Sequence, residues 1–479
     1  MWYKRVVVWR SIGCYPSFLY DPINMQLLPP LLTTLLVCTV SATNPGQASN
    51  FDVSAAVAEE HSCDSVCQET LNQTNAADLG IFDSSFDFDF YATADNFTSS
   101  SPSSRGSLLK IKPLNGTALS IPAGVSIYKF QYTSQDVNGS LVPATGFIAF
   151  PFARPQKSDP FKLVAFAHGT TGVFHGCAPS TSSYLFDYNS WTPLLLAGYA
   201  VVATDYAGLG NNMTTHQYIA SAANANDIYW SVVAAHEAFP SDLTHEWVSI
   251  GHSQGGGATY KLSEHELVQD DSSGYLGGVS IGPITKIYDS VVEGLRSLDE
   301  YSGSNMLGEI GSVVLGVQSV LPNYTAPFLG NTMRQRIELA NIGQLCNTAL
   351  SGLASNLSMT DLIGKISATD VIALQGFQKI NAPAQGDKAS KPLLLIQSQD
   401  DTVVLKSLVS KAYEASCSIG NPVRLSLYPG LDHSATVGAS APEWLAFIEG
   451  LFSSTVNVDD CVNGTSTPFD LEHAATSTH

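Results

Sequence analysis

Short apolar segments alternate with longer helix-like stretches from residue 127 onward, and this alternation limits the fold more than any other feature of the sequence. Eight of these segments are rich in the β-branched and aromatic residues that favour strands. They are YKFQYTS, TGFIAFPFA, KLVAFAHG, YAVVATDY, WVSIGHS, GGVSIGP, KPLLLIQS and VRLSLYPG. Helical stretches separate most of the later ones, notably Ala222–Ala238 and Gly255–Val268. The pattern predicts an α/β fold: a mostly parallel sheet with helices on both faces.

The interval 285–390 interrupts this alternation with about a hundred residues of mixed, helix-like sequence. It separates two predicted core strands, so we expect it to lie over the carboxyl ends of the strands, where open α/β sheets bind ligands. We predict a helical cap on a core made of 106–284 and 391–460, followed by a tail, 461–479. The alternative is a helical subdomain away from the ligand site.

The N-terminal segment predicts export. The run Leu27–Val40 is apolar but shorter than the ~20 residues that span a membrane, and Val40-Ser41-Ala42 resembles a signal peptidase site. We therefore expect 1–42 to be a leader, with Met25 as the true start and a signal anchor as the alternative. The Ser- and Asp-rich segment 43–105 is expected to be a loosely ordered arm.

Cysteines and sequons agree with export to an extracellular location. Six of the eight cysteines lie beyond the predicted leader, an even number that suits a disulfide-bonded extracellular chain. Eight Asn-x-Ser/Thr sequons are candidate glycosylation sites, and each predicts an exposed loop. Their asparagines are Asn72, Asn96, Asn115, Asn138, Asn212, Asn323, Asn356 and Asn463.

The charge of the chain limits its partners. A formal net charge of −20 repels phosphate backbones and anionic lipid surfaces, so nucleic acid is not an expected partner. The cysteines and histidines lack zinc spacing, and we expect neither a metal nor another cofactor. We expect a monomer.

The pentapeptide Gly251-His252-Ser253-Gln254-Gly255 joins a predicted strand to a predicted helix. A G-x-S-x-G sequence in this context is typical of a nucleophile elbow, where the serine occupies a strained turn and larger neighbours would collide with the strand or helix. We predict that Ser253 is a nucleophile and that the backbone N–H of Gln254 faces the same site. The alternative is a structural tight turn.

A serine nucleophile needs a general base and a carboxylate that orients the base. Asp400 and Asp401 follow a late predicted strand, and Asp401 better matches a Gly-x-x-Asp-x-x-Val-Pro pattern, although Ser398 and Leu405 occupy its Gly and Pro positions. Asp400 stays the alternative, as does a turn with two solvated aspartates. His433 follows the last predicted strand, and the resulting order Ser, Asp, His makes it the expected base.

The loop Ala167–Gly172, after an early predicted strand, is the expected second half of an oxyanion hole. We assign its donor to the backbone N–H of Thr170, with Thr171 as the nearest alternative. His168 is expected to shape this loop, and a role as base is the alternative.

Several linked motifs resemble those of the fungal secretory lipases: HGTTG with CAPS, GYAVVATDYAGLG, IGHSQGGGAT and HSATVGASAPEWLAFI. The likeness spans roughly Ile127–Phe452. It implies a capped α/β-hydrolase fold that hydrolyses triacylglycerols and simpler esters. It also suggests the disulfides Cys177–Cys346 and Cys417–Cys461, which leaves Cys63 and Cys67 to pair locally in the arm.

We therefore expect a secreted serine ester hydrolase, foremost a triacylglycerol lipase. The apolar cap segments would form an acyl pocket and a lid that opens in transient contact with a lipid interface. Asp205 and Tyr206, within the second motif, are expected to be structural. A short-chain esterase, an acyltransferase and a secreted peptidase of the same fold are the alternatives, ahead of a binding protein without catalysis.

Overall fold

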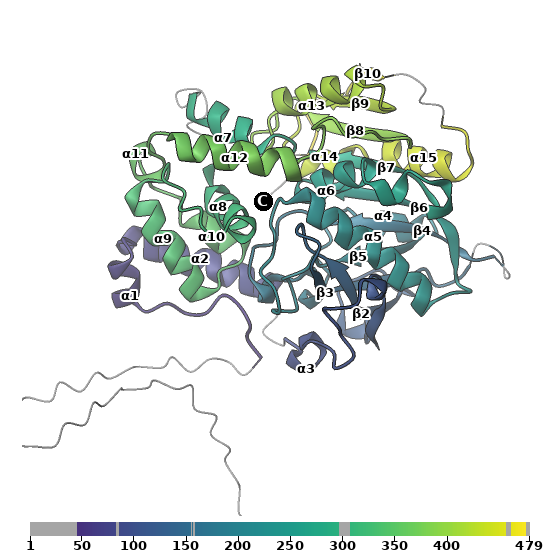
Figure 1. The fold of residues 1–479 in the computed structure, drawn as a ribbon, viewed down its shortest axis with the longest axis horizontal. Coiled ribbons are helices and arrows are strands. Elements are labelled where there is room, and N and C mark those ends of the chain that lie inside the picture. Colours follow the sequence, from purple (N-terminus) through teal and green to yellow (C-terminus); the bar gives the residue numbers. More distant parts are fainter. Residues whose placement is uncertain are drawn as a thin grey trace, which may run out of the picture. The chain divides into compact units, whose positions relative to one another are not determined.

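Ten strands form one sheet within the residues that the computed structural model describes, which are 46–82, 86–154, 156, 159–296, 307–456 and 461–475. The strands are β1 (Leu108–Pro113), β2 (Ser126–Gln135), β3 (Leu141–Phe150), β4 (Phe161–Ala167), β5 (Ala200–Thr204), β6 (Leu243–His252), β7 (Tyr275–Ile281), β8 (Leu393–Ser398), β9 (Val423–Tyr428) and β10 (Val462–Thr465). Their order in the sheet is β1-β2-β3-β5-β4-β6-β7-β8-β9-β10 (Figure 1).

Strand direction divides the sheet into two parts. The pairs β1–β2, β2–β3 and β3–β5 are antiparallel. The pairs that continue from β5 through β4, β6, β7, β8 and β9 to β10 are parallel. The mostly parallel sheet predicted from the alternation of segments is confirmed.

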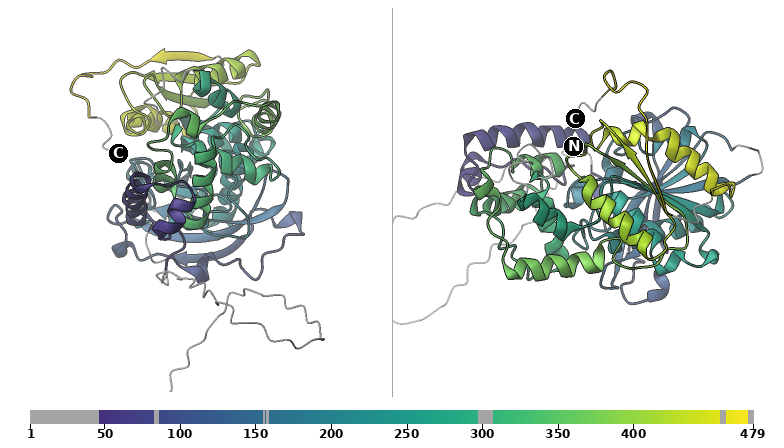
Figure 2. Two further views of the ribbon diagram at one scale, coloured as in Figure 1. Left: turned by 90° about the vertical axis from the view of Figure 1, so that its left-hand side faces the viewer. Right: turned by 90° about the horizontal axis from the view of Figure 1, so that it is seen from above.

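Helices cover both faces of the sheet, because its central strands carry apolar side chains on both sides. One face packs against α5 (Ser221–Ala238), α6 (Gln254–Ser263) and α13 (Lys406–Ser418), and the other against α4 (Thr192–Leu196), α14 (Ala435–Ala439) and α15 (Ala441–Phe452). In β8, Leu393 and Leu395 pack with α13, whereas Leu394 and Ile396 pack with α15. Figure 2 shows these two helices on opposite faces.

The chain between β7 and β8 forms the helical cap. Its helices in the described residues are α7 (Ile287–Arg296), α8 (Ile310–Val320), α9 (Asn331–Gly343), α10 (Asn347–Gly352), α11 (Met359–Leu362) and α12 (Ala368–Asn381). The start of α10 is attached to the loop after β4: the N–H of Asn347 donates to the carbonyl oxygen of Thr171 at 3.0 Å, and Cys346 forms a disulfide with Cys177. The cap is therefore joined to the carboxyl end of the sheet.

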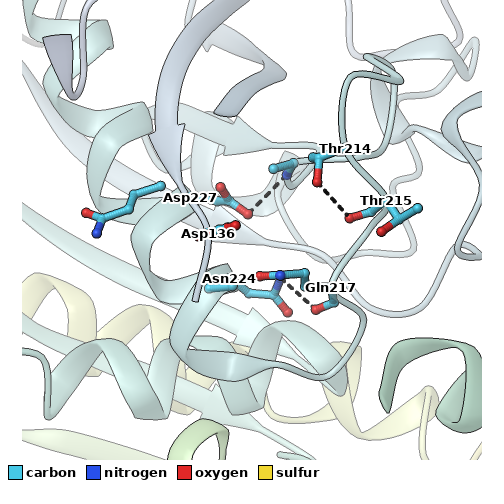
Figure 3. A pocket seen from close by; sticks show the side chains of 9 residues that line it. Asp136, Thr214, Thr215, Gln217, Asn224 and Asp227 are labelled. Atoms are coloured by element: carbon cyan, nitrogen blue, oxygen red, sulfur yellow. Dashed lines mark hydrogen bonds between the residues drawn. The ribbon is translucent and has the colours of Figure 1, made fainter. Parts of the chain in front are cut away.

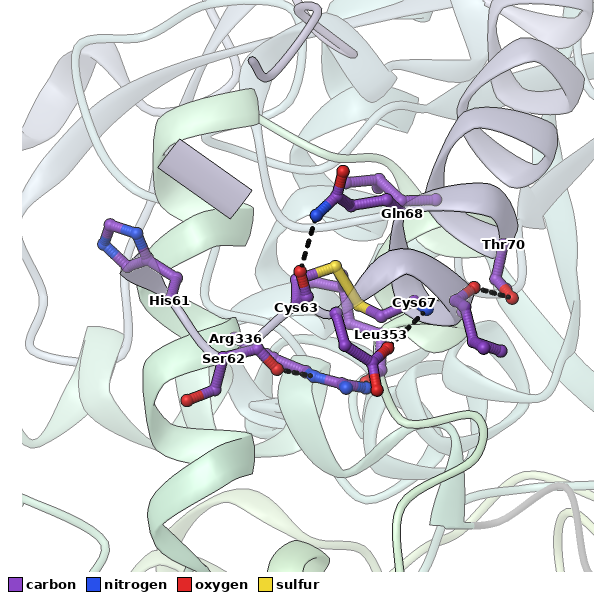
Figure 4. Close-up of a disulfide and its surroundings, with 12 residues drawn as sticks. His61, Ser62, Cys63, Cys67, Gln68, Thr70, Arg336 and Leu353 are labelled. Atoms are coloured by element: carbon purple, nitrogen blue, oxygen red, sulfur yellow. Dashed lines mark hydrogen bonds between the residues drawn. A yellow bond between two sulfur atoms is a disulfide. The ribbon is translucent and has the colours of Figure 1, made fainter. Parts of the chain in front are cut away.

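The expectation of a loosely ordered arm, 43–105, is wrong for its described part. Helices α1 (Ala55–Glu60), α2 (Ser65–Ile81) and α3 (Phe88–Tyr91) form there, and Leu71 joins the hydrophobic core of the cap. The disulfide between Cys63 and Cys67 is buried in the same core (Figure 4). The arm has too few apolar residues to form a hydrophobic core of its own. Those it has are enough to order it, because the cap supplies the other residues of the shared core.

Polar contacts complete the attachment of the arm. The guanidinium group of Arg336, on α9, donates to the carbonyl oxygens of Ser62 and Leu353 (Figure 4). The carboxylate of Asp78, on α2, accepts the backbone N–H groups of Thr348 and Ala349 in the first turn of α10. These donors have no partner inside their own helix, so the arm stabilises a helix of the cap.

The predicted tail, 461–479, is also corrected, because it contains β10. This strand pairs in parallel with β9, although all four of its residues are exposed and its short sequence shows no apolar alternation. The disulfide between Cys417 and Cys461 fixes the residue directly before β10 beside the sheet. The core therefore extends beyond residue 460.

The structure bears on only some of the expectations about the leader, glycosylation and membrane segments. The chain divides into the units Met1–Ala42 and Thr43–His479, and every described residue belongs to the second. The predicted leader with Met25 lies outside the described residues. The asparagine of each of the eight sequons is exposed. Over the described ranges, helices long and apolar enough to cross a membrane are absent.

Candidate active site

Ser253 occupies a strained turn between β6 and α6. Its φ of 58° and ψ of −117° lie in a region that residues other than glycine rarely adopt. Backbone hydrogen bonds hold this conformation: the N–H of Ser253 donates to Ile281 at 2.9 Å, and its carbonyl oxygen accepts the N–H of Gly257 at 3.0 Å. The turn directs the chain from strand to helix within one residue, as a nucleophile elbow does.

The two flanking glycines are required by close backbone contacts. A β-carbon on Gly251 would lie 2.1 Å from the carbonyl oxygen of Gly255, and one on Gly255 would lie 2.0 Å from that of Ala167. Both distances are too short for any larger residue. The start of α6 therefore touches the end of β4, which brings the predicted oxyanion loop beside Ser253.

His433 forms a hydrogen-bonded pair with Asp401. The Nδ1 atom of His433 lies 2.7 Å from Oδ2 of Asp401, whose Oδ1 accepts the N–H groups of Val403 and Val404 at 2.8 Å each. Burial alone raises the pKa of Asp401, but the charge of His433 and these donors outweigh burial and lower it. The carboxylate stays ionised and holds the imidazole with its proton on Nδ1 and its Nε2 free to accept another.

The pair lies next to the serine turn. The His433 ring is 4.4 Å from the ring of His252, the residue before Ser253, and His252 Nε2 donates to the carbonyl oxygen of His433 at 3.2 Å. The Nε2 atom of His433 is buried, and among the described residues it has no hydrogen-bond partner. Asp400 is directed elsewhere, because its carboxylate accepts the N–H of Gly430 at 2.6 Å. The structure thus brings Asp401, rather than Asp400, together with His433 and the turn.

The loop after β4 is anchored at successive residues. The N–H of Gly169 donates to the hydroxyl of Tyr188 at 3.0 Å, and the Thr170 hydroxyl lies 2.8 Å from that of Tyr218. The carbonyl oxygen of Thr171 is bound by the cap, as described above. These contacts fix the loop beside Ser253, and the choice of Thr170 over Thr171 as oxyanion donor stays a prediction.

The side chain of Gln254 is also held. Its Nε2 donates to Nε2 of His216 at 2.9 Å and to Oδ1 of Asn224 at 3.2 Å. Burial lowers the pKa of His216 to about 3, so its ring stays neutral and accepts this hydrogen bond. Gln254 is the first residue of α6, and these contacts hold it in place. Its backbone N–H, the other predicted oxyanion donor, is therefore held as well.

His168 is structural rather than a base. Its two ring nitrogens face backbone carbonyl oxygens, Nδ1 that of Gly169 at 2.6 Å and Nε2 that of Asp205 at 3.2 Å, and burial lowers its pKa to about 4. The carboxylate of Asp205 accepts instead from the N–H and hydroxyl of Ser180 and from the hydroxyl of Thr145. The Tyr206 hydroxyl donates to the carbonyl oxygen of His168 at 3.0 Å. These contacts agree with the structural role expected for Asp205 and Tyr206.

A small polar hollow lies beside this network, not at Ser253. Its walls include Asp136, Thr214, Thr215, Gln217, Asn224 and Asp227 (Figure 3). Its volume of about 10 Å³ is enough for one water molecule and not for an organic substrate. Asp227 accepts from Ser134 and from the N–H of Ala207, and burial raises its pKa to about 7.

Several residues around the site belong to no recognisable motif, among them Tyr188, His216 and Glu309. The first two belong to loops without a recognisable pattern. Glu309 did leave a signal, because it is the single charged residue in the apolar run MLGEIGSVVLGVQSVL. Across the described part of the chain, clusters of three or more His, Cys, Asp or Glu that could hold a metal ion are absent.

Comparison with known proteins identifies the fold. No protein-family model matches the sequence, and no curated protein matches it either. Among solved structures, Candida antarctica lipase A in its closed state matches with a TM-score of 0.63 and 18% identity, over 80% of this chain and 90% of that one. The rice cell wall degrading esterase LipA from Xanthomonas oryzae matches with a TM-score of 0.56 and 20% identity, over 72% and 99% of the two chains.

A putative hydrolase from Legionella pneumophila matches with a TM-score of 0.58 and 16% identity, over 73% of this chain and 99% of that one. Identities this low establish the fold and nothing finer. The chain has the α/β-hydrolase fold, and the predicted resemblance to the fungal lipase group is confirmed at the level of the fold by Candida antarctica lipase A.

Proposed function

We propose that this chain is a carboxylic-ester hydrolase with Ser253 as its nucleophile, and foremost a triacylglycerol lipase. One observation carries the proposal: an imidazole held by a buried carboxylate presents an unpaired Nε2 beside a strained serine turn. A structural histidine would use both ring nitrogens or leave one in solvent. The named lipase and esterase neighbours of the fold support the same chemistry.

The proposed reaction has two steps. His433 takes the proton of the Ser253 hydroxyl while the oxygen attacks the ester carbonyl carbon, and the backbone N–H groups of Gln254 and Thr170 stabilise the oxyanion. The carbonyl re-forms, the bond to the alcohol oxygen breaks, and His433 gives its proton to that oxygen. Water then attacks the acyl-enzyme in the same way and releases the acid.

The cap is proposed to move before substrate enters. Ser253 is only 6% exposed and Nε2 of His433 is buried, so the reacting atoms are covered. We propose that the cap opens during transient contact with a lipid interface and forms the acyl pocket. Activity should then rise abruptly when a short-chain triacylglycerol exceeds its solubility. A smooth hyperbolic curve through that concentration would contradict the lid.

The cellular setting is likewise proposed from sequence features. The leader predicted within 1–42, the three disulfides and the eight exposed sequons support a secreted glycoprotein. Mass spectrometry of the mature protein would locate its first residue and its glycans. A chain that retains residues 1–42 and lacks glycans would contradict this proposal.

The direct functional test is hydrolysis of p-nitrophenyl esters from acetyl to palmitoyl. The wild type should release p-nitrophenol, and Ser253→Ala should lose at least about 10³-fold in kcat while it keeps the thermal unfolding temperature of the wild type. Addition of a primary alcohol separates hydrolysis from acyl transfer, because a transferase would form the new ester. Unchanged activity in Ser253→Ala would rule out the proposed nucleophile.

A further inference from the structure

Glu309 places a buried carboxyl group in the cap that the proposed reaction does not use. It directly precedes α8, and its Oε1 accepts long hydrogen bonds from Asn347 Nδ2 at 3.4 Å and from the Ser351 hydroxyl at 3.2 Å. Its other oxygen, Oε2, is buried, and so is Oδ1 of Asn347. Neither atom has a hydrogen-bond partner among the described residues.

This cluster lies against the candidate catalytic centre. The backbone of Asn347 binds the carbonyl oxygen of Thr171 in the oxyanion loop. Burial raises the pKa of Glu309. The polar contacts with Ser351, Asn347 and Ser312 oppose this rise, and His433 is near enough for its charge to oppose it as well. The Ser312 hydroxyl also lies close to the Glu309 carboxyl group and helps to lower its pKa, although the two form no hydrogen bond of normal geometry. The Thr171 hydroxyl is buried without a hydrogen-bond partner in the described part of the chain.

A cluster of buried polar atoms is a poor lining for a pocket that binds plain hydrocarbon chains. Buried polar atoms are nearly always paired, and each unpaired one lowers stability. A hydrocarbon chain leaves these atoms unpaired, whereas a hydroxyl group can donate to Asn347 Oδ1 or Glu309 Oε2 and accept from the Ser312 hydroxyl. An ammonium group is a poorer match, because the imidazolium that His433 becomes during the reaction would repel it.

We propose that Glu309 and Asn347 form a polar subsite that binds a hydroxyl group of the substrate, so that hydroxylated esters react in preference to plain alkyl esters. This inference rests on the proposed ester hydrolysis and narrows its substrate class. The hydroxyl group belongs either to the acyl chain or to a polyol alcohol such as glycerol. Both present the same chemistry to the subsite.

Two matched substrate pairs distinguish the two sources: ethyl 3-hydroxyoctanoate against ethyl octanoate, and glycerol monooctanoate against propyl octanoate. We expect the wild type to favour the hydroxylated member of one pair by at least about tenfold in kcat/KM. Glu309→Leu should reduce that ratio by at least about tenfold, whereas Glu309→Gln should keep it within about threefold. The pair whose ratio changes identifies the source of the hydroxyl.

The matched control is Glu338→Leu, which removes an exposed carboxylate from another helix of the cap, α9. It should leave both ratios unchanged. A ratio compares two substrates on one protein sample, so partial misfolding cancels, and Asn347→Leu provides the same test if Glu309→Leu does not fold.

Equal ratios in Glu309→Leu and the wild type would overturn the subsite, with ester hydrolysis itself intact. If the wild type hydrolysed none of these esters, the proposed function would fail first and the subsite with it.

Discussion

Asp400 and Asp401 are neighbours in the sequence, but their carboxylates have different partners. Asp401 holds His433, while Asp400 accepts the N–H of Gly430. Asp401→Asn should lower kcat by about 10³–10⁴-fold, because an amide cannot hold the imidazole in the tautomer that accepts the serine proton. Asp400→Asn, as the matched control, should change kcat by less than about tenfold. Steady-state kinetics on one p-nitrophenyl ester compares them, and equal losses would remove Asp401 from the site.

The buried carboxyl group of Asp227 should make the stability of the protein depend on pH. Its pKa is raised by burial to about 7, compared with about 3.9 in an unfolded chain. The folded protein therefore keeps a proton that the unfolded chain releases between these values. The stability that this group contributes is fully present below about pH 4 and is lost as pH rises to about 7.

Asp227→Asn has no carboxyl group to titrate. The unfolding free energy of the wild type should therefore fall relative to that of the variant by about 1.4 kcal/mol per pH unit between about pH 4 and pH 7. Urea unfolding of both proteins across this range measures the difference. A difference that does not vary with pH would show that Asp227 is ionised in the folded protein.

The residues of the site could be predicted from the sequence to the extent that their signals are local. Ser253 has its motif, its strand and its helix within about 20 residues, and the order Ser, Asp, His then limits where Asp401 and His433 can be. Glu309 has only a weak local signal, as the single charge in an apolar run, and His216 has none. Their partners, Asn347 and Gln254, are set by tertiary contacts that no sequence period encodes.

Some strands and helices could be predicted from their own sequence, whereas others depend on tertiary contacts. The central strands have continuous apolar sequences, and all eight predicted segments are strands in the structure. The edge strand β10 has neither burial nor alternation and depends on the disulfide beside it. The polar composition of α1 and α2 predicts disorder. The helices form because their few apolar residues pack against apolar residues of the cap.

The turn from β6 to α6 has no space for a side chain at Gly255. Gly255→Ala should reduce the folded yield severely or destabilise the protein by more than about 3 kcal/mol, because its β-carbon would meet backbone and not a movable side chain. Gly376→Ala, in α12, is the control, since no atom lies within 4 Å of its β-carbon position. It should stabilise the protein by about 0.5–1 kcal/mol. Thermal unfolding compares them, and a neutral Gly255→Ala would contradict the close contact.

Over Thr43–His479, arm and cap share one hydrophobic core, and the cap is in turn joined to the sheet by a disulfide and a backbone hydrogen bond. The described part of the arm therefore belongs to the same folded unit as the cap and the sheet. The sequence could predict neither this packing nor its polar contacts, because the residues that form these contacts lie more than two hundred positions apart in the chain.

Two substitutions on α2 test the role of the arm. Leu71→Asp places a carboxylate in the shared core and should lower the unfolding free energy by at least about 3 kcal/mol. Ala76→Asp introduces the same group on the exposed side of the helix and should cost less than about 1 kcal/mol. Chemical unfolding distinguishes them, and equal small effects would mean that the arm is loose in solution.

The central claim is that Ser253 becomes acylated by an ester. Treatment with a p-nitrophenyl alkylphosphonate, which mimics the tetrahedral intermediate and stays attached, tests it most directly when peptide mass spectrometry follows. One phosphonate per chain should be found, on Ser253, with activity lost in proportion to labelling and with no label in His433→Ala. A label on another residue, or full activity in the labelled protein, would contradict the account.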